Sequence, residues 1–398
     1  MVRRFPPLVV LGALVAILGW AGPAAAATQP MTWNAAQIGV AVAHGSGYFG
    51  RGVTVAVVDG YVDPTHPEFS TVAGRPESGS RVLAGADCRS GVCVPGQGAA
   101  DDCGHGTHVA GIVASATYGV APQATVLPIR ALSEAADGSC SGSPQAVAGG
   151  INWAVAHGAQ IVNLSLGDAG GTDLQGPDVR AAVHGAASHG VLVVVAAGNQ
   201  SRSTDVPNYG PDALVVAATG PDNALASYSD FGPDVTLAAP GGDNQGQLCN
   251  PSDCIASTWL DHRYALLAGT SMAAPEVAGT AALLISAMPG ISRPTLVSAL
   301  EQGAHPLVGT RYGRIDVAAS VKLLAIPHST PSVGGSRVSA AGGTPALQTP
   351  PSNAAITTVT SPGSDTGPRG PWQIALLLLV VVSALLGAVS WSAQQSDD

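Results

Sequence analysis

The sequence predicts an α/β fold in which buried parallel strands alternate with helices. Two β-branched apolar runs carry this prediction: residues 52–59, which end on Asp59, and residues 191–198, which are followed by Asn199. Continuous apolar runs of this length are typical of strands that are covered on both faces. A third observation is that segments rich in small apolar residues, with helical character, lie between and after these runs. Asp59 and Asn199 are therefore expected at the carboxyl ends of strands, where open α/β sheets bind ligands.

The two predicted helices both begin beside a residue with catalytic potential. His105 precedes the apolar segment 109–116, and Ser271 lies in a small-residue turn before the segment 277–288. A serine hydroxyl becomes a useful nucleophile when a base takes its proton. The unpaired N–H groups and the dipole at a helix N-terminus favour developing negative charge nearby. Ser271, His105 and Asp59 are thus the candidate nucleophile, base and orienting carboxylate.

Four short segments carry a resemblance to a known enzyme family: Val-Val-Asp at 57–59, His-Gly-Thr-His at 105–108, Ala-Ala-Gly-Asn at 196–199 and Gly-Thr-Ser-Met-Ala at 269–273. They resemble the subtilisin-type serine proteases, the subtilase family or peptidase family S8, in which the triad follows the chain order Asp, His, Ser. The resemblance covers residues 28–325. It implies a subtilisin-like fold with a largely parallel seven-stranded sheet and helices on both faces, and it implies a serine endopeptidase.

The resemblance also implies a role for each catalytic residue. Ser271 attacks the peptide carbonyl, His105 takes and later returns the proton, and Asp59 holds the imidazole in the right tautomer. The side-chain amide of Asn199, with the backbone N–H of Ser271, receives the oxyanion. Asp63 lies beyond the predicted strand end and is expected to be a loop carboxylate.

Substrate-binding positions are likewise implied by the resemblance. One wall of the primary specificity pocket is formed by Ser165, Leu166 and Gly167, and the other by Ala196, Ala197 and Gly198. Gly142 lies in the edge segment that pairs with extended peptide by β-augmentation. The small, uncharged lining predicts a preference for apolar side chains before the cut, because their burial is favourable.

No metal and no cofactor are expected. In many subtilases the helix after the catalytic histidine carries an asparagine-containing calcium loop, which this chain lacks. Gln29 and Glu68 match other ligand positions of that site, but calcium requires six to eight oxygens. His108 has no third ligand at a suitable spacing, and the resemblance makes it a structural histidine.

Six cysteines indicate an oxidising compartment. Cys88 and Cys93 are close in sequence, as are Cys249 and Cys254, so each pair is expected to close a small loop. The resemblance places the remaining two, Cys103 and Cys140, on segments that flank the substrate cleft, which makes a third disulfide the prediction. The alternative is a free Cys103 thiol beside His105.

The two ends of the chain differ in composition from its centre. Residues 1–27 have the charged start, apolar run and small-residue end of a secretory signal peptide. Residues 326–371, rich in Pro, Ser, Thr and Gly, predict a stalk, and the uncharged segment 372–391 is long enough to span a bilayer. Residues 392–398 would then form a short cytoplasmic tail, and the domain at 28–325 would be extracytoplasmic on a single-pass cell membrane protein.

This layout resembles that of the mycosins, membrane-anchored subtilases associated with type VII secretion. Residues 33–38 resemble the mature N-terminus of subtilases, so no propeptide domain is expected. Two hypotheses follow: an endopeptidase that processes exported proteins, or a mainly structural component of a type VII secretion system. The expected partners are protein or peptide substrates and the membrane, and the net charge of −10 argues against nucleic acid.

Overall fold

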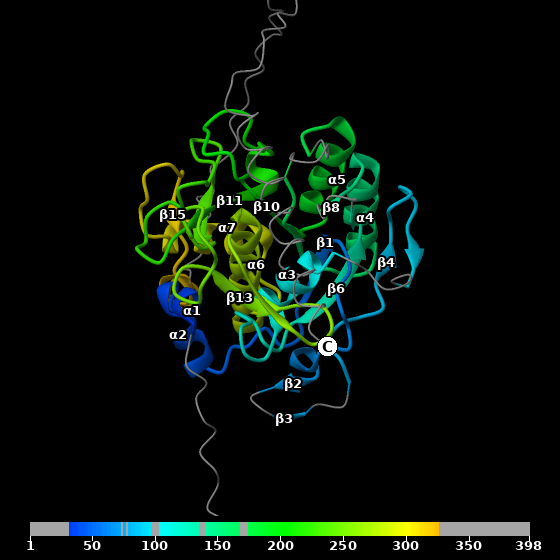
Figure 1. Ribbon diagram of the computed structural model, residues 1–398, viewed down its shortest axis with the longest axis horizontal. Helices are drawn as coiled ribbons and strands as arrows, with labels where there is room; N and C mark the ends of the chain where they lie inside the picture. Colours follow the sequence, from blue (N-terminus) through cyan, green and yellow to red (C-terminus); the bar gives the residue numbers. More distant parts are fainter. Residues whose placement is uncertain are drawn as a thin grey trace, which may run out of the picture. The chain divides into compact units, whose positions relative to one another are not determined.

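A nine-stranded sheet organises the chain in the computed structural model, which describes residues 32–72, 75–76, 79–96, 103–134, 140–167 and 174–325 (Figure 1). The strand order is β15-β12-β11-β10-β9-β1-β6-β4-β5. In chain order the strands are β1 (Thr54–Asp59), β4 (Ala86–Asp87), β5 (Val94–Pro95), β6 (Thr125–Arg130), β9 (Ile161–Leu164), β10 (Leu192–Ala196), β11 (Ala213–Thr219), β12 (Leu237–Pro240) and β15 (Gly313–Arg314).

The sheet is parallel at every pairing except that of β4 with β5. The prediction of a largely parallel sheet is therefore confirmed. The expected count of seven strands is wrong, because three two-residue strands extend a body of six longer ones. One of these short strands, β15, lies at one edge, and β4 and β5 lie at the other. Such short edge strands have no apolar run long enough to be detected by pattern.

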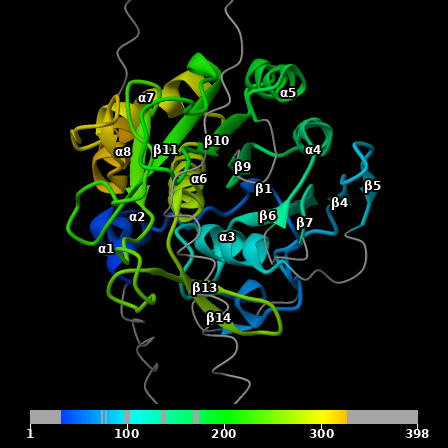
Figure 2. The same ribbon diagram turned by 45° about the horizontal axis from the view of Figure 1, so that its top comes forward.

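Helices cover both faces, as expected. In β1, Val55 and Val57 pack into one hydrophobic cluster, whereas Ala56 and Val58 pack into the other. The first cluster contains α3 and α6 and the second contains α4 and α5, which lie side by side (Figure 2). The helices are α1 (Trp33–Gln37), α2 (Val40–Gly45), α3 (His105–Ala114), α4 (Pro144–Ala156), α5 (Pro177–Ser188), α6 (Thr270–Ala287), α7 (Arg293–Gly303) and α8 (Val317–Ala325).

Smaller elements and disulfides shape the loops around this sheet. Three antiparallel hairpins are formed by β2 (Thr71–Val72) with β3 (Arg75–Pro76), β7 (Ser133–Glu134) with β8 (Cys140–Ser141), and β13 (Ile255–Thr258) with β14 (Tyr264–Leu267). The disulfides are Cys88–Cys93, Cys103–Cys140 and Cys249–Cys254. All three predicted pairings are present, so the alternative of a free Cys103 is wrong.

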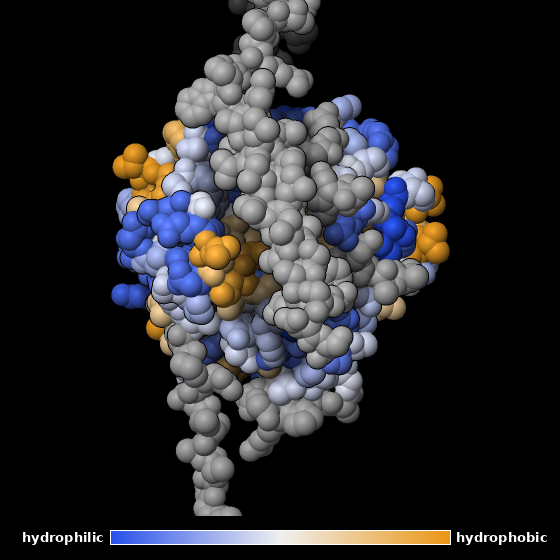
Figure 3. Space-filling view, in the orientation of Figure 1, coloured by the Kyte–Doolittle hydropathy of each residue, from blue (hydrophilic) through white to orange (hydrophobic). Residues whose placement is uncertain are grey.

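Apolar side chains on the surface are dispersed. Figure 3 shows them in small separate patches on the face drawn. Scattered exposed apolar residues of this kind are normal. The large ones among the described residues are Val42, Leu83, Val92, Val94, Leu248, Tyr264, Val308 and Tyr312.

The predicted signal peptide (1–27), stalk (326–371), membrane segment (372–391) and tail (392–398) lie outside the described residues. Among the helices that are described, none has the length and apolar character needed to cross a bilayer.

Candidate active site

Asp59 and His105 form a directly hydrogen-bonded pair. Asp59 is the last residue of β1, near the middle of the sheet, and its side chain is fully buried. Its Oδ1 and Oδ2 lie 2.9 and 3.0 Å from Nδ1 of His105, the first residue of α3. The backbone N–H of Gly60 donates to the same Oδ1 at 2.7 Å. The carboxylate is thus held in place and in turn fixes the orientation of the imidazole.

The electrostatics of this pair favour a charged imidazole. Burial by itself lowers the pKa of His105, but the negative charge of Asp59 and its hydrogen bond outweigh burial, so that the pKa is raised above 6.5. The His105 side chain keeps 24% of its surface exposed and lines the cleft that also contains Ser271. It can therefore exchange a proton with a group in the cleft.

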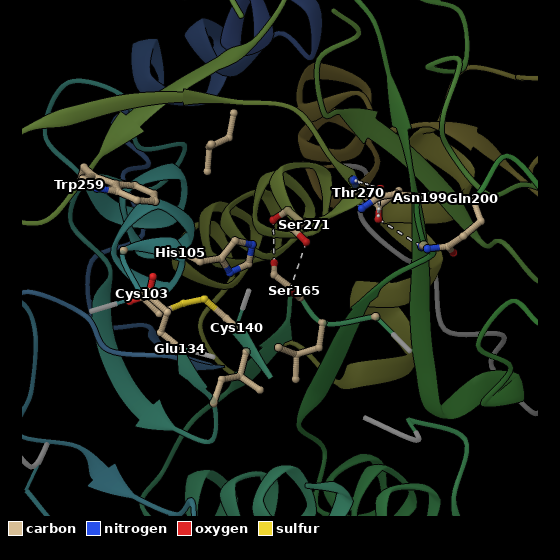
Figure 4. A pocket seen from close by; sticks show the side chains of 16 residues that line it. Cys103, His105, Glu134, Cys140, Ser165, Asn199, Gln200, Trp259, Thr270 and Ser271 are labelled. Carbon is tan, nitrogen blue, oxygen red and sulfur yellow. Dashed lines mark hydrogen bonds between the residues drawn. A yellow bond between two sulfur atoms is a disulfide. The ribbon is translucent and has the colours of Figure 1, made fainter. Parts of the chain in front are cut away.

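Ser271 lies on the first turn of α6, and its hydroxyl donates to the carbonyl oxygen of Ser165 at 3.2 Å. The Ser165 hydroxyl donates back to the carbonyl of Ser271 at 2.7 Å. Pro275 explains this second bond, because it has no N–H to donate to the carbonyl four residues before it. Figure 4 shows Ser271 and His105 at the same cleft. The Ser271 hydroxyl is bonded to Ser165 and not to His105, and the bond between a nucleophile and its base often forms fully only when substrate binds.

Asn199 follows β10 and lies beside Thr270, the residue before Ser271, in the lining of the same cleft (Figure 4). Its Oδ1 accepts hydrogen bonds from the backbone N–H of Thr270 at 2.9 Å and from the Thr270 hydroxyl at 3.0 Å. Because Oδ1 accepts both bonds, the orientation of the amide is defined and its Nδ2 is the end that can donate to a substrate. Its position at the N-terminus of α6 favours negative charge there.

A cavity of about 390 Å³ joins these residues. Of the predicted substrate-binding positions, Ser165, Leu166, Gly167 and Gly198 line it. Ala196, Ala197 and Gly142 are not among its lining residues. The two alanines are buried in the hydrophobic clusters, and Gly142 packs closely against Ala131 and Leu132. Of the pocket wall predicted at Ala196, Ala197 and Gly198, only Gly198 lines this cavity. The reason is that the side chains of the two alanines, at the end of β10, point into the core.

Several residues that line the cavity were not predicted from the sequence, and two of them have large or charged side chains. Glu134 of β7 and Trp259, just after β13, both line the cavity beside the Cys103–Cys140 disulfide (Figure 4). The indole lies against Gly104, where an added Cβ would collide with the ring. The only available signal was the expected disulfide, which brings the β7–β8 hairpin to the catalytic histidine.

The positions considered for metal binding are engaged otherwise. Both carboxylate oxygens of Glu68 accept hydrogen bonds from Thr117 at 2.7 Å, and Oε1 also accepts one from Tyr264 at 3.0 Å. His108 is buried, and burial together with the nearby charge of His105 lowers its pKa to about 3, so it is neutral. No cluster of three or more potential metal ligands occurs within the described ranges. Gln29 lies outside them.

Comparisons with known proteins agree with this geometry. The sequence model of the subtilase family matches residues 50–335. The chain belongs to the subtilase family. This subtilase is 35% identical over 284 residues to thermitase from Thermoactinomyces vulgaris, covering 69% of the chain and 90% of thermitase. It is 34% identical over 293 residues to subtilisin Savinase from Lederbergia lenta, covering 72% and 96%.

The fold comparison gives the same answer. A solved protease structure from Pseudoalteromonas arctica PAMC 21717 superposes with a TM-score of 0.60 and 30% identity, covering 72% of this chain and 93% of that one. The subtilase is therefore a subtilisin-type serine peptidase, and the prediction of a serine endopeptidase is confirmed.

Proposed function

We propose that this subtilase is a membrane-anchored, extracytoplasmic endopeptidase that processes exported proteins through Asp59, His105 and Ser271. The observation that carries the catalytic assignment is the buried Asp59–His105 hydrogen bond at a cleft that also contains Ser271 and Asn199. The membrane location rests on the sequence alone, on the signal peptide at 1–27 and the apolar segment at 372–391.

The first chemical step is attack by Ser271 Oγ on the substrate carbonyl. To make it, the hydroxyl leaves its 3.2 Å bond with Ser165 and donates its proton to Nε2 of His105. The Asp59 carboxylate stabilises the imidazolium that results. Negative charge then develops on the carbonyl oxygen, where the Nδ2 of Asn199 and the backbone N–H of Ser271 donate to it.

The later steps use the same groups. His105 gives its proton to the departing amine, which leaves an acyl-enzyme on Ser271. A water molecule then attacks this ester, with neutral His105 as its base, and regenerates the serine. The lining at 165–167 contains no charged side chain, so an apolar residue before the cut is favoured.

A second candidate function is a mainly structural part in a type VII secretion complex, which the mycosin-like order of signal peptide, domain, stalk and apolar segment favours. The two functions differ in their dependence on Ser271. Secretion that continues at wild-type level in cells carrying Ser271→Ala supports the structural function, and its loss supports processing.

A fluorophosphonate probe tests the catalytic assignment on the full-length chain. We expect labelling of the wild type and of Ser286→Ala, a control in the same helix α6 whose hydroxyl donates to Leu283. Ser271→Ala should not be labelled. Labelling of Ser271→Ala, or no labelling of a folded wild type, would refute the assignment.

The membrane location has a separate test. A chain ending at residue 371 should be released from the membrane fraction, and its retention there would contradict the location.

A further inference from the structure

The loop that carries Asn199 is tied to a second segment of main chain. The N–H of Asp230 donates to the carbonyl of Gly198 at 2.9 Å, and the N–H of Ser201 donates to that of Tyr228 at 2.8 Å. These bonds join residues 198–202 to 228–231, so that the loop does not depend on β10 alone for its position.

The side chain of Asp230 adds to these backbone bonds. It is 1% exposed, and its Oδ1 accepts the N–H groups of Gln200 at 2.9 Å and Arg202 at 3.0 Å. Together with its own N–H, Asp230 therefore bonds the main chain on both sides of Asn199. Its Oδ2 lies 3.8 Å from Nε of Arg202. Hydrogen bonds to an ionised acceptor are the stronger kind.

Gly198 shows how closely the carboxylate fits this loop. Its φ of +118° is in the region that favours glycine, and an added Cβ would collide with Oδ2 of Asp230. The carboxylate thus occupies the space beside the residue that immediately precedes Asn199. The loop and the acid are shaped to each other.

Thr270 and Asp230 control different parts of the oxyanion donor. The two bonds from Thr270 fix the plane of the Asn199 amide, whereas Asp230 holds the backbone from which the amide projects. A donor to a transition-state oxyanion is effective only when it is already in place. Misplacement by about 1 Å can cost about a hundredfold in rate.

We propose that Asp230 is a positioning residue that holds the Asn199 loop so that the amide meets the oxyanion. The proposal rests on the proposed role of Asn199 as oxyanion donor. Asp230 is buried and does not line the cleft, so its loss should change kcat more than KM.

The test compares Asp230→Ala and Asp230→Asn in the full-length chain, with kcat and KM for a chromogenic peptide amide. Values of kcat are expressed per site titrated to completion with a fluorophosphonate, so that unfolded protein does not count. We expect Asp230→Ala to lower kcat about tenfold to a hundredfold. This loss is smaller than the loss of about 10²–10³-fold in kcat when an oxyanion donor of subtilisin is deleted, because Asn199 itself is still present. KM should change less than about threefold, as expected for an interaction made in the transition state. Asp230→Asn should recover most of kcat, because its amide oxygen can accept both N–H groups.

A double-mutant cycle with Asn199→Ala separates positioning from general damage. In the Asn199→Ala background, Asp230→Ala should lower kcat less than about threefold. An equal loss in both backgrounds, or a loss confined to KM, would overturn the proposal. Asp222→Ala is the matched control, because that exposed acid also accepts a loop N–H, from Ala224 at 3.0 Å, and kcat should be unchanged.

Failure of the inference and failure of the proposed function give different results. If Ser271→Ala retains turnover, the catalytic assignment fails. If Ser271→Ala is inactive but Asn199→Ala has wild-type kcat, the peptidase assignment stands and the role of Asp230 is refuted. If Asp230→Ala does not fold, Asp230→Ser replaces it in the same cycle. The serine hydroxyl is too short to reach the N–H groups of both Gln200 and Arg202.

Discussion

The buried carboxyl of Glu276 should make the stability of this subtilase fall as pH rises. Glu276 lies on α6, five residues after Ser271, and is fully buried. Its Oε1 accepts a hydrogen bond from Nδ2 of Asn34, on α1, at 2.5 Å, and its Oε2 has no hydrogen-bond partner among the described residues. Burial raises its pKa from 4.5 to about 8, although the bond from Asn34 acts in the opposite direction.

The contribution of Glu276 to the free energy of unfolding depends on pH because its pKa differs between the folded and unfolded chain. Between pH 4.5 and about 8 the unfolded chain has lost this proton while the native protein retains it, so the native state is destabilised as pH rises. At about 1.36 kcal/mol per pH unit, the loss is about 3 kcal/mol at pH 7 and about 5 kcal/mol above pH 8. Below pH 4.5 both states are protonated and the effect disappears.

Glu276→Gln removes the titration but keeps an acceptor for Asn34. We expect the variant to match its parent near pH 4.5 and to exceed it in free energy of unfolding by about 3 kcal/mol at pH 7 and about 5 kcal/mol at pH 9. The measurement is denaturant unfolding of both chains in a Ser271→Ala background, which prevents self-digestion. Asp222→Asn, at an exposed position, is the control and should show no such trend.

A stability difference that is the same at all three pH values would refute the reasoning. It would mean that Glu276 titrates alike in the folded and unfolded chain, and that burial does not perturb it. A difference that grows toward acid pH would contradict it as well, because it would require a stabilising carboxylate.

Three further predictions concern the cleft. The pKa of His105 is raised above 6.5, and the base must be neutral, so kcat/KM should rise with pH with an apparent pKa above 6.5. Asp59→Asn should lower this apparent pKa, and it should also lower kcat about 10⁴-fold. Replacing Cys103 and Cys140 together by serine should cost about 2–4 kcal/mol of stability and raise KM, because their disulfide lines the cavity. Among the described residues that line the cavity, Glu134 is the one carboxylate. Glu134→Gln should therefore weaken the preference for a Lys or Arg side chain at one position of a peptide library about fivefold.

Each of these has a clear contrary result. The first fails if Asp59→Asn leaves the pH profile unchanged. The second fails if loss of Cys103–Cys140 has no more effect on KM than loss of Cys249–Cys254, the control disulfide away from the cleft lining. The third fails if Glu134→Gln and wild type cleave the library alike, as Glu301→Gln, on α7, is expected to do.

The sequence by itself determined the fold class, the candidate catalytic residues and the two disulfides between cysteines five residues apart, whereas the Cys103–Cys140 pairing is implied by the family resemblance. These features are recorded locally, because an apolar run that ends on a polar residue shows where a strand stops, as at Asp59. The helix after Ser271 is predicted over 277–288, but α6 begins at Thr270, so Ser271 lies in the first turn of the helix and not in a turn before it. The chain order Asp, His, Ser adds the family. None of these features requires knowledge of which elements are neighbours.

Only the tertiary structure decided which distant side chains support those residues. The bonds of Ser165 to Ser271, Asp230 to the Asn199 loop and Asn34 to Glu276 join segments far apart in sequence. Pattern analysis cannot find them, because strand order and loop packing set them and leave no periodic signal. The same holds for the strand count, for the burial of Ala196 and Ala197, and for Glu134 and Trp259 in the cleft. Local chemistry marks where a reactive group lies, and packing alone decides what holds it.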